Sequence, residues 1–221
     1  MVNELLKMSH LLSPYVIGAE GNVSCKVDNT FYIKGSGKSL STLCKEDLVL
    51  CDMIGNIYPS YNASENKPSI ETGFHAWLLS NLDINFVAHT HPTNTLKILC
   101  SKEIYNFSKF RLFPDQVVFN GSESCVVEYY HPGDELLNGI KISVNEYLSK
   151  HGYPPKIILL KNHGVITFGK NISECILSTE MCEKSAEVFL GSLFSPDYLS
   201  EDDVNKIIND NKEKYRQQNY K

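Results

Sequence analysis

The chain has 221 residues, of which 42% are hydrophobic and 21% are charged. These fractions are typical of a soluble globular protein and exclude the disordered and fibrous classes. The formal net charge of -5 argues against nucleic acid as the main partner. No apolar run reaches the roughly 18–20 residues of a membrane span. We therefore expect one domain over residues 1–221, with neither nucleic acid nor a membrane as its partner.

The cysteine usage indicates a reducing compartment. There are seven cysteines, an odd number, and no CxxC pair occurs. The first ten residues, MVNELLKMSH, lack the apolar segment of a secretory signal. We therefore expect free thiols in a cytoplasmic protein rather than a disulfide framework.

The predicted elements mix helices and strands without a regular βαβ alternation. Apolar spacing of three to four residues predicts helices over 3–12, 71–79, 93–99, 135–150 and 173–190. Alternating or β-branched runs predict strands over 23–27, 30–33, 48–51, 57–58, 84–89, 116–119, 156–160 and 165–168. Several neighbouring strands read as hairpins, so the pattern favours a largely antiparallel sheet covered by helices. From about residue 199 the chain is a polar tail that is helical at most.

Two histidines end the apolar strand predicted over 84–89. His89 and His91 are two residues apart, so on a strand both imidazoles point to the same side. Neutral imidazoles suit zinc and related divalent ions, and an HxH pair is a natural half of such a site. The alternative is a pair of histidines that are merely solvated or hydrogen-bonded.

A third histidine and a glutamate are candidates to complete that site. His163 lies between Asn162 and Gly164 at the tip of a predicted hairpin, where a rigid scaffold would place it. Glu71 falls in the first turn of a predicted helix, where free backbone amides favour a carboxylate. His163 is equally well explained as an exposed turn residue. Glu71 has three open interpretations: a metal ligand, a general base, or a favourable charge at a helix start.

Glycine-rich loops at 18–22 and 35–38 offer backbone amides, an amide side chain, a hydroxyl and a lysine. Such loops can bind phosphate, as can the helix start at Ser69. Neither loop matches the P-loop or the dinucleotide-binding pattern, so ATP and NAD are not indicated. Each loop taken alone is also compatible with a plain turn.

Taken together, these motifs resemble the class II aldolase/adducin family, which includes fuculose-phosphate and rhamnulose-phosphate aldolases. The resemblance extends over about residues 18–190 and is carried by five motifs in order: Gly21-Asn22, Ser36-Gly37, Glu71, His89-Thr90-His91 and Asn162-His163-Gly164. It implies an α/β fold, a three-layer αβα sandwich with a central, mainly antiparallel β-sheet. It also implies a homotetramer with active sites at the subunit interfaces.

The resemblance further implies a role for each motif. His89, His91 and His163 would bind a divalent metal, Zn²⁺ or another ion such as Mn²⁺ or Co²⁺. Glu71 would bind the metal in the resting state or act as the base. The remaining family positions would bind the phosphate of a sugar phosphate: Gly21, Asn22, Ser36, Gly37, Lys38 and Ser69. In the reaction so implied, the metal polarises the oxygens of a ketose phosphate and Glu71 moves a proton on or off carbon.

The family pattern is not matched everywhere. Ile70 follows Ser69 where aldolases often have a second hydroxyl residue, which leaves open whether the substrate is phosphorylated; Lys38 could compensate by its charge. Aldolases often receive a catalytic tyrosine from a neighbouring subunit. Tyr129 is the best match, with Tyr130 and Tyr215 as alternatives.

We therefore expect a metal-dependent aldolase that cleaves a ketose phosphate to dihydroxyacetone phosphate and an aldehyde. Within the family, an epimerase, dehydratase or decarboxylase is the alternative. A different class of alternative is a non-catalytic, adducin-like binding domain, against which the presence of all three histidines argues.

Overall fold

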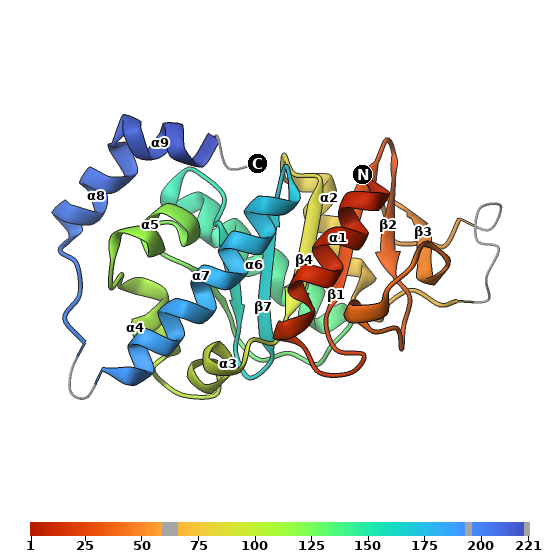
Figure 1. The fold of residues 1–221 in the computed structure, drawn as a ribbon, viewed down its shortest axis with the longest axis horizontal. Coiled ribbons are helices and arrows are strands. Elements are labelled where there is room, and N and C mark those ends of the chain that lie inside the picture. Colours follow the sequence, from red (N-terminus) through yellow and green to blue (C-terminus); the bar gives the residue numbers. More distant parts are fainter. Residues whose placement is uncertain (59–65, 193–195, 219–221) are drawn as a thin grey trace.

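A seven-stranded sheet runs through the centre of the molecule (Figure 1), a computed structural model that describes residues 1–58, 66–192 and 196–218. The strands are β1 (Asn22–Val27), β2 (Thr30–Lys34), β3 (Leu48–Asp52), β4 (Phe86–Thr90), β5 (Cys125–Val127), β6 (Ile157–Leu160) and β7 (Gly164–Gly169). Their order across the sheet is β3-β2-β1-β4-β7-β6-β5. Every pairing between these strands is antiparallel except that of β5 with β6. The predicted, mainly antiparallel sheet is confirmed.

Helices cover both faces of this sheet. They are α1 (Val2–Leu12), α2 (Thr72–Asn81), α3 (Thr93–Leu99), α4 (Ile104–Lys109), α5 (Pro114–Asn120), α6 (Asp134–His151), α7 (Ile172–Gly191), α8 (Glu201–Asn209) and α9 (Asn211–Gln218). Short 3-10 turns lie at Ser13–Tyr15, Leu40–Thr42 and Lys45–Asp47. Helices α1 and α7 cross the face turned to the viewer in Figure 1. Helices α2 and α6 pack on the opposite face, which makes the predicted three-layer αβα sandwich.

Because side chains alternate along a strand, neighbouring residues of the central strands point to opposite faces of the sheet. On β1, Val23 and Cys25 point into the core shared with α1 and α7, so Asn22 and Ser24 point toward α2. On β4, Val87 belongs to the core shared with α2, and His89 therefore points to the same side. The α2 face of β1 and β4 thus carries polar groups at one end of an otherwise apolar layer.

The predicted strand over 116–119 is wrong, because the structure has helix α5 there. Phe113 is extended, Pro114 occupies the first helical turn, and Gly121 ends the helix with a φ of 78°. Val117 and Val118 are both buried. A short run of apolar residues does not distinguish a strand from a buried helix, and here the proline and glycine boundaries favour the helix.

Other boundaries differ in smaller ways. The sequence did not predict α4 or β5, which are only six and three residues long. The strand predicted over 57–58 is reduced to a single bridge between Cys51 and Ile57. The polar tail forms α8 and α9, which lie apart from α1 at the other side of the molecule (Figure 1). In the part of the chain that the structure describes, no helix is long and apolar enough to cross a membrane.

Candidate metal centre

Three histidines converge at one end of the central strands of the sheet. His89 is the penultimate residue of β4 and His91 follows that strand directly, while His163 lies in the turn between β6 and β7. Their nearest ring nitrogens all lie within 4.8 Å of one another. The antiparallel pairing of β4 with β7 brings the two chain segments together, because it places His89 opposite Ile166. The predicted convergence is therefore present in the structure.

Two backbone positions make this close approach possible. A Cβ atom on Gly164 would lie 2.5 Å from the ring of His91 and 2.6 Å from the carbonyl oxygen of Thr90. Only glycine leaves room for the imidazoles at that point. Asn162, the residue before His163 in this turn, takes a left-handed conformation with a φ of 56°. Asparagine tolerates this conformation better than most residues.

The geometry of the rings defines which nitrogens face the shared point. The Nδ1–H of His89 donates to the carbonyl oxygen of Val165 over 2.9 Å, so its Nε2 is left with a lone pair. That Nε2 is 3.0 Å from the Nε2 of His91. A histidine ring fixed by a backbone carbonyl in this way is typical of a metal ligand.

Glu71 lies directly before α2 with its carboxylate between the rings. It is only 8% exposed, and its Oε2 is 3.4 Å from the Nε2 of His89. Its Oε1 is 3.4 Å from the Nε2 of His163 and has no hydrogen-bond partner among the described residues. A buried carboxylate oxygen without a partner is costly unless a cation compensates its charge.

These groups fit a divalent cation. Ligand atoms about 2.0–2.1 Å from a tetrahedral zinc ion lie about 3.3–3.4 Å apart. The Nε2 atoms of His89 and His91 are 3.0 Å apart, and each oxygen of Glu71 is 3.4 Å from one histidine nitrogen, which is close to that value. The three histidine nitrogens as a set lie within 4.8 Å of one another. Three imidazoles and one carboxylate form a donor set suited to zinc and to several other divalent ions. The donor set, together with the unpartnered Oε1 of Glu71, supports a metal site.

The three rings are electrically neutral at ordinary pH, as metal ligands must be. Burial, together with the neighbouring His163, lowers the pKa of His89 to about 3. Burial and the neighbouring His89 lower the pKa of His91 to about 4, against an opposing effect of Glu20. Burial also lowers the pKa of His163. Protons therefore compete weakly with a metal ion for these nitrogens.

Part of the predicted phosphate site lies beside the metal centre. Gly21 has a φ of 63°, and a Cβ there would lie 2.6 Å from the carbonyl oxygen of His89, so the loop packs directly on β4. The side-chain amide of Asn22 donates to Ser69 over 3.2 Å and to Glu71 over 2.8 Å. The structure thus brings Gly21, Asn22 and Ser69 together with Glu71.

The second glycine-rich loop contains the other predicted phosphate residues. Ser36 and Gly37 are exposed, and the backbone N–H of Ser36 donates to Lys67. The ammonium of Lys38 forms an ion pair with Asp47 at 2.8 Å, so its charge is already partly compensated. Ile70 is 72% exposed next to Ser69. The second hydroxyl that aldolases often have there is therefore replaced by an open apolar surface.

A lysine that the sequence analysis did not select joins the two loops. Lys34 is only 2% exposed, and its Nζ donates to the carbonyl oxygens of Ala19 and Lys38, one on each loop. Burial lowers the pKa of Lys34 to about 8, although the charge of Glu71 acts in the opposite direction. The only sequence signal was a lysine between the strand predicted over 30–33 and the glycine-rich loop that follows it.

Two further side chains around the histidines were not predicted. The carboxylate of Glu20 lies 3.5 Å from the Nδ1 of His91 and accepts a hydrogen bond from the backbone of Ile17. His75, one turn after Glu71 on α2, is completely buried and hydrogen-bonds with Asn22. Burial, together with the nearby His89, lowers the pKa of His75 well below its usual value. The i,i+4 spacing of Glu71 and His75 was the signal available for the second of these.

The candidate tyrosines follow the edge strand or lie in the tail. Tyr129 follows the edge strand β5, three strand positions from β4, but the parallel pairing of β5 with β6 places Val127 opposite Leu160, beside the turn that contains His163. Tyr129 is 58% exposed, so it is accessible to another subunit. The ring of Tyr130 packs on α6, within 2.3 Å of where a Cβ on Gly139 would lie. Tyr215 belongs to α9, but its side chain lies outside the described residues.

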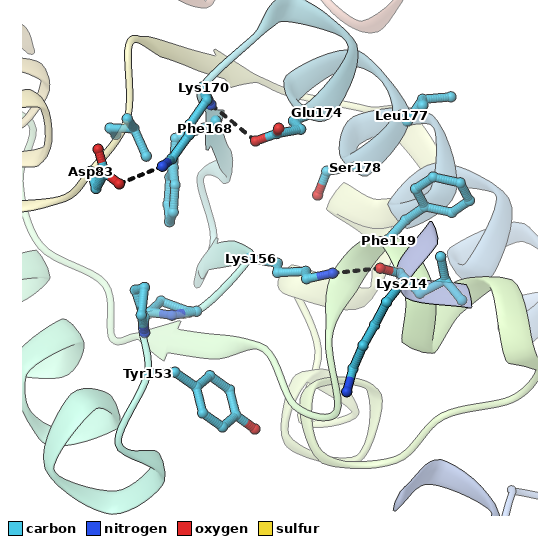
Figure 2. A pocket seen from close by; sticks show the side chains of 15 residues that line it. Asp83, Phe119, Tyr153, Lys156, Phe168, Lys170, Glu174, Leu177, Ser178 and Lys214 are labelled. Atoms are coloured by element: carbon cyan, nitrogen blue, oxygen red, sulfur yellow. Dashed lines mark hydrogen bonds and ion pairs between the residues drawn. The ribbon is translucent and has the colours of Figure 1, made fainter. Parts of the chain in front are cut away.

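A cavity lies at the other end of the sheet from the histidines (Figure 2). Its volume is about 530 Å³, and Phe168 and Gly169 at the far end of β7 contribute to its wall. The acidic groups around it are paired, because Lys170 bonds both Asp83 and Glu174 (Figure 2). The residues that line it include none of the predicted site residues. This cavity is therefore separate from the histidine cluster.

Comparisons with known proteins identify the family. A sequence model of the Class II Aldolase and Adducin N-terminal domain matches residues 4–190. A relative named L-fuculose phosphate aldolase from Methanococcus maripaludis is 31% identical over 191 residues, which cover 85% of this chain and 94% of the relative. A 3-oxo-tetronate 4-phosphate decarboxylase from Haemophilus influenzae is 29% identical over 79% of each chain. The fold is similar to that of a sugar-phosphate aldolase from Thermotoga maritima, with a TM-score of 0.70, 20% identity and coverage of 86% of this chain and 93% of that one.

Replacement of a ligand histidine is expected to remove the metal. Purified wild-type protein should contain about one equivalent of divalent metal per chain, and His91→Ala should lose most of it, because one of three imidazoles is gone. Elemental analysis after dialysis measures the content. His10→Ala is the control, since the His10 ring contacts the carbonyl oxygen of Leu43, far from the site. Equal metal content in wild type and His91→Ala would contradict the assignment.

The buried rings also predict how the metal-free protein responds to acid. The pKa values of His75, His89, His91 and His163 are all lowered in the folded state. As the pH falls from about 6.5 toward 4, the unfolded chain binds protons that the folded chain does not, so the free energy of unfolding should decrease. Urea unfolding of chelator-treated protein at several pH values measures this slope. His91→Ala should have a shallower slope; a wild-type stability that rises on acidification would contradict the prediction.

Proposed function

Because the chain belongs to the class II aldolase and adducin family, we propose that it is a metal-dependent aldolase. Its reaction is the retro-aldol cleavage of a ketose phosphate to dihydroxyacetone phosphate and an aldehyde. The single observation that supports this most strongly is the position of the partnerless Oε1 of Glu71 among three neutral imidazoles. Next to Glu71 lies the glycine-rich loop that contains Gly21, which packs on β4 beside the histidines.

The residues divide into groups with distinct tasks. His89, His91 and His163 would bind a divalent cation, and when bound it supplies Lewis acidity toward the oxygens of the substrate. The side-chain amide of Asn22 orients Glu71 by donating a hydrogen bond to its Oε2. With Oε2 engaged by that amide, Oε1 is the oxygen that faces the site and is available for proton transfer.

Retro-aldol cleavage requires two proton movements. The hydroxyl group that becomes the aldehyde oxygen loses a proton, and the bond between carbons 3 and 4 breaks. The electron pair of that bond remains on carbon 3, which then takes up a proton to become the CH₂OH carbon of dihydroxyacetone phosphate. Glu71 is assigned the proton on carbon 3. Tyr129 of a neighbouring subunit is assigned the proton of the hydroxyl group.

Phosphate binding is assigned to the two glycine-rich loops. Gly21, Ser36 and Gly37 provide backbone amides or a hydroxyl, and Ser69 provides a second hydroxyl beside Glu71. Lys34 supports this assignment, because its buried ammonium holds a carbonyl oxygen on each loop and adds positive charge between them. Asn22 and Lys38 belong to the same cluster, but both side chains have partners within the protein. Local charge can thus oppose the net charge of -5.

The proposal includes the setting in which the enzyme works. The metal is assigned as Zn²⁺, with Mn²⁺ or Co²⁺ as alternatives that the same ligands accept. The active form is a homotetramer, and the exposed position of Tyr129 supports its contribution across a subunit interface. We place it in the cytoplasm, since all seven cysteines are free thiols. Residues 1–221 are taken as one domain with a helical tail from about residue 199.

A decarboxylase is the second candidate. Relatives named 3-oxo-tetronate 4-phosphate decarboxylase are similar to this chain at a level close to that of the aldolases. Decarboxylation of a 3-oxo acid breaks a bond to the carbon beside a carbonyl, as aldol cleavage does, and likewise leaves an electron pair to be protonated. Both candidates act on a phosphorylated substrate, so Ile70 does not distinguish between them.

A substrate panel separates these functions. The metal-loaded protein is incubated with ketose 1-phosphates and with 3-oxo acid phosphates, and dihydroxyacetone phosphate and CO₂ are measured. We expect dihydroxyacetone phosphate from at least one ketose 1-phosphate. Glu71→Gln should reduce kcat by about 10²-fold or more, which is the usual loss for a general base. Glu123→Gln, which alters an exposed pair with Lys150, is the matched control and should keep wild-type activity.

The other results each exclude the aldolase. Release of CO₂ without triose phosphate identifies a decarboxylase, and a product of inverted stereochemistry or with one water less identifies an epimerase or a dehydratase. A protein that binds metal but converts no member of the panel is better explained as a binding domain. Full activity of Glu71→Gln would contradict the role of Glu71 as the base.

A further inference from the structure

Two pairs of polar residues face each other behind the metal centre. Asn22 and Ser24 lie two residues apart on β1, and Glu71 and His75 lie four residues apart where α2 begins. Two strand residues span about 6.7 Å and four helical residues about 6.0 Å, so the two spacings nearly match. Asn22 can therefore meet Glu71 while Ser24 meets His75.

Hydrogen bonds join these residues into one chain. The hydroxyl of Ser24 is 2.7 Å from the Nδ1 of His75. The Nε2 of His75 bonds to the Oδ1 of Asn22. The Nδ2 of Asn22 then donates to Glu71 over 2.8 Å and to Ser69 over 3.2 Å. Ser24, His75 and Asn22 are at most 2% exposed, so water does not compete for these bonds.

The carboxylate of Glu71 at one end of this hydrogen-bonded chain determines the positions of the protons along it. A carboxylate only accepts, so the group of Asn22 that faces Glu71 must be its NH₂ and the group that faces His75 must be its oxygen. An oxygen acceptor requires a proton on the Nε2 of His75. In a neutral ring the Nδ1 then lacks a proton and accepts from the hydroxyl of Ser24. This single arrangement gives every polar side-chain atom of Ser24, His75 and Asn22 a hydrogen-bond partner.

We propose that His75 is a positioning residue, which together with Ser24 locks the Asn22 amide so that both of its N–H groups point to Glu71 and Ser69. This inference rests on the proposed function for its catalytic meaning. It changes the role of Asn22, because an amide with both N–H groups and its oxygen engaged has no donor left for a phosphate. Asn22 acts on the substrate through Glu71 and Ser69, and His75 acts through Asn22.

The hydrogen bond from His75 keeps the side-chain amide of Asn22 in one orientation. Without a donor at Nε2 of His75, the amide could rotate by half a turn and place its oxygen 2.8 Å from the carboxylate of Glu71. Two acceptors at that distance repel each other, and the carboxylate would shift away from the position it has between the histidines. A buried imidazole of fixed tautomer prevents this rotation, much as partners of metal ligands fix ligand orientation.

The tautomer of His75 is measurable without any assay of activity. Proton–nitrogen correlation spectra of histidine-labelled protein distinguish a ring protonated at Nε2 from one protonated at Nδ1. We expect Nε2–H in wild type. Ser24→Ala removes the donor to Nδ1 and should change the chemical shift of that nitrogen. Ser185→Ala is the matched control, because Ser185 is equally buried and its hydroxyl has no hydrogen-bond partner among the described residues.

Two substitutions of His75 test the effect on catalysis. His75→Gln keeps an N–H that can reach the Asn22 oxygen, whereas His75→Leu keeps the volume but offers no donor. We expect His75→Leu to lower kcat by about 10- to 100-fold, the range typical of groups that orient a metal site, and His75→Gln to recover most of that loss. KM should change less than kcat, and circular dichroism and metal content should stay at wild-type levels in both variants. Equal kcat in the Leu and Gln variants overturns the proposal.

Failure of this inference can be separated from failure of the proposed function. If Nδ1 of His75 carries the proton in wild type, the proposed role of His75 is wrong, whatever the protein catalyses. If Nε2 carries the proton and Ser24→Ala changes the chemical shift of Nδ1, the proposed role of His75 is supported even where no ketose phosphate is cleaved. In that case only the aldolase assignment is lost.

Discussion

The carboxylate of Glu71 is buried among three neutral imidazoles, and among the described residues no lysine or arginine forms an ion pair with it, although the buried Lys34 acts on it electrostatically. The rest of the site depends on this constraint. A buried charge is tolerated only if it is paired or bound to a metal ion. One oxygen is satisfied by the amide of Asn22, and the other faces the ring nitrogens with no partner in the described structure. A divalent cation at that point would compensate the carboxylate and use the lone pairs of the rings at once.

The fold meets this constraint because it brings segments that are distant in the sequence to the same end of the central strands. Strand β4 carries two of the histidines, the β6–β7 turn carries the third, and β1 supports the carboxylate from the α2 side. Gly21 and Gly164 permit backbone and rings to approach within distances that any side chain would block. The site is therefore built on strands and tight turns rather than on long loops, which favours fixed ligand geometry.

Much of this arrangement could be predicted from local patterns. The spacing of His89 and His91 and the position of Glu71 at a helix start identified these residues as candidates. Each pattern had an alternative explanation, and only the family resemblance implied a role for it. The involvement of Lys34 and the direction of the Asn22 amide could not be predicted, because they depend on loops that meet only through strand pairing. The helix over Pro114–Asn120 was missed because its two buried valines suit a strand or a helix, and the helix signals of Pro114 and Gly121 at its ends were not used. The helix packs against α7 and α8.

X-ray absorption of the zinc-loaded protein tests the central claim most directly, because it reports the atoms bound to the metal. We expect nitrogen and oxygen neighbours at about 2.0–2.1 Å, with the multiple scattering of three imidazoles and no sulfur shell. Glu71→Gln should alter the oxygen contribution and leave the imidazole scattering in place. A sulfur shell near 2.3 Å, which one of the seven cysteines would supply, or scattering from fewer than three imidazoles would contradict the account.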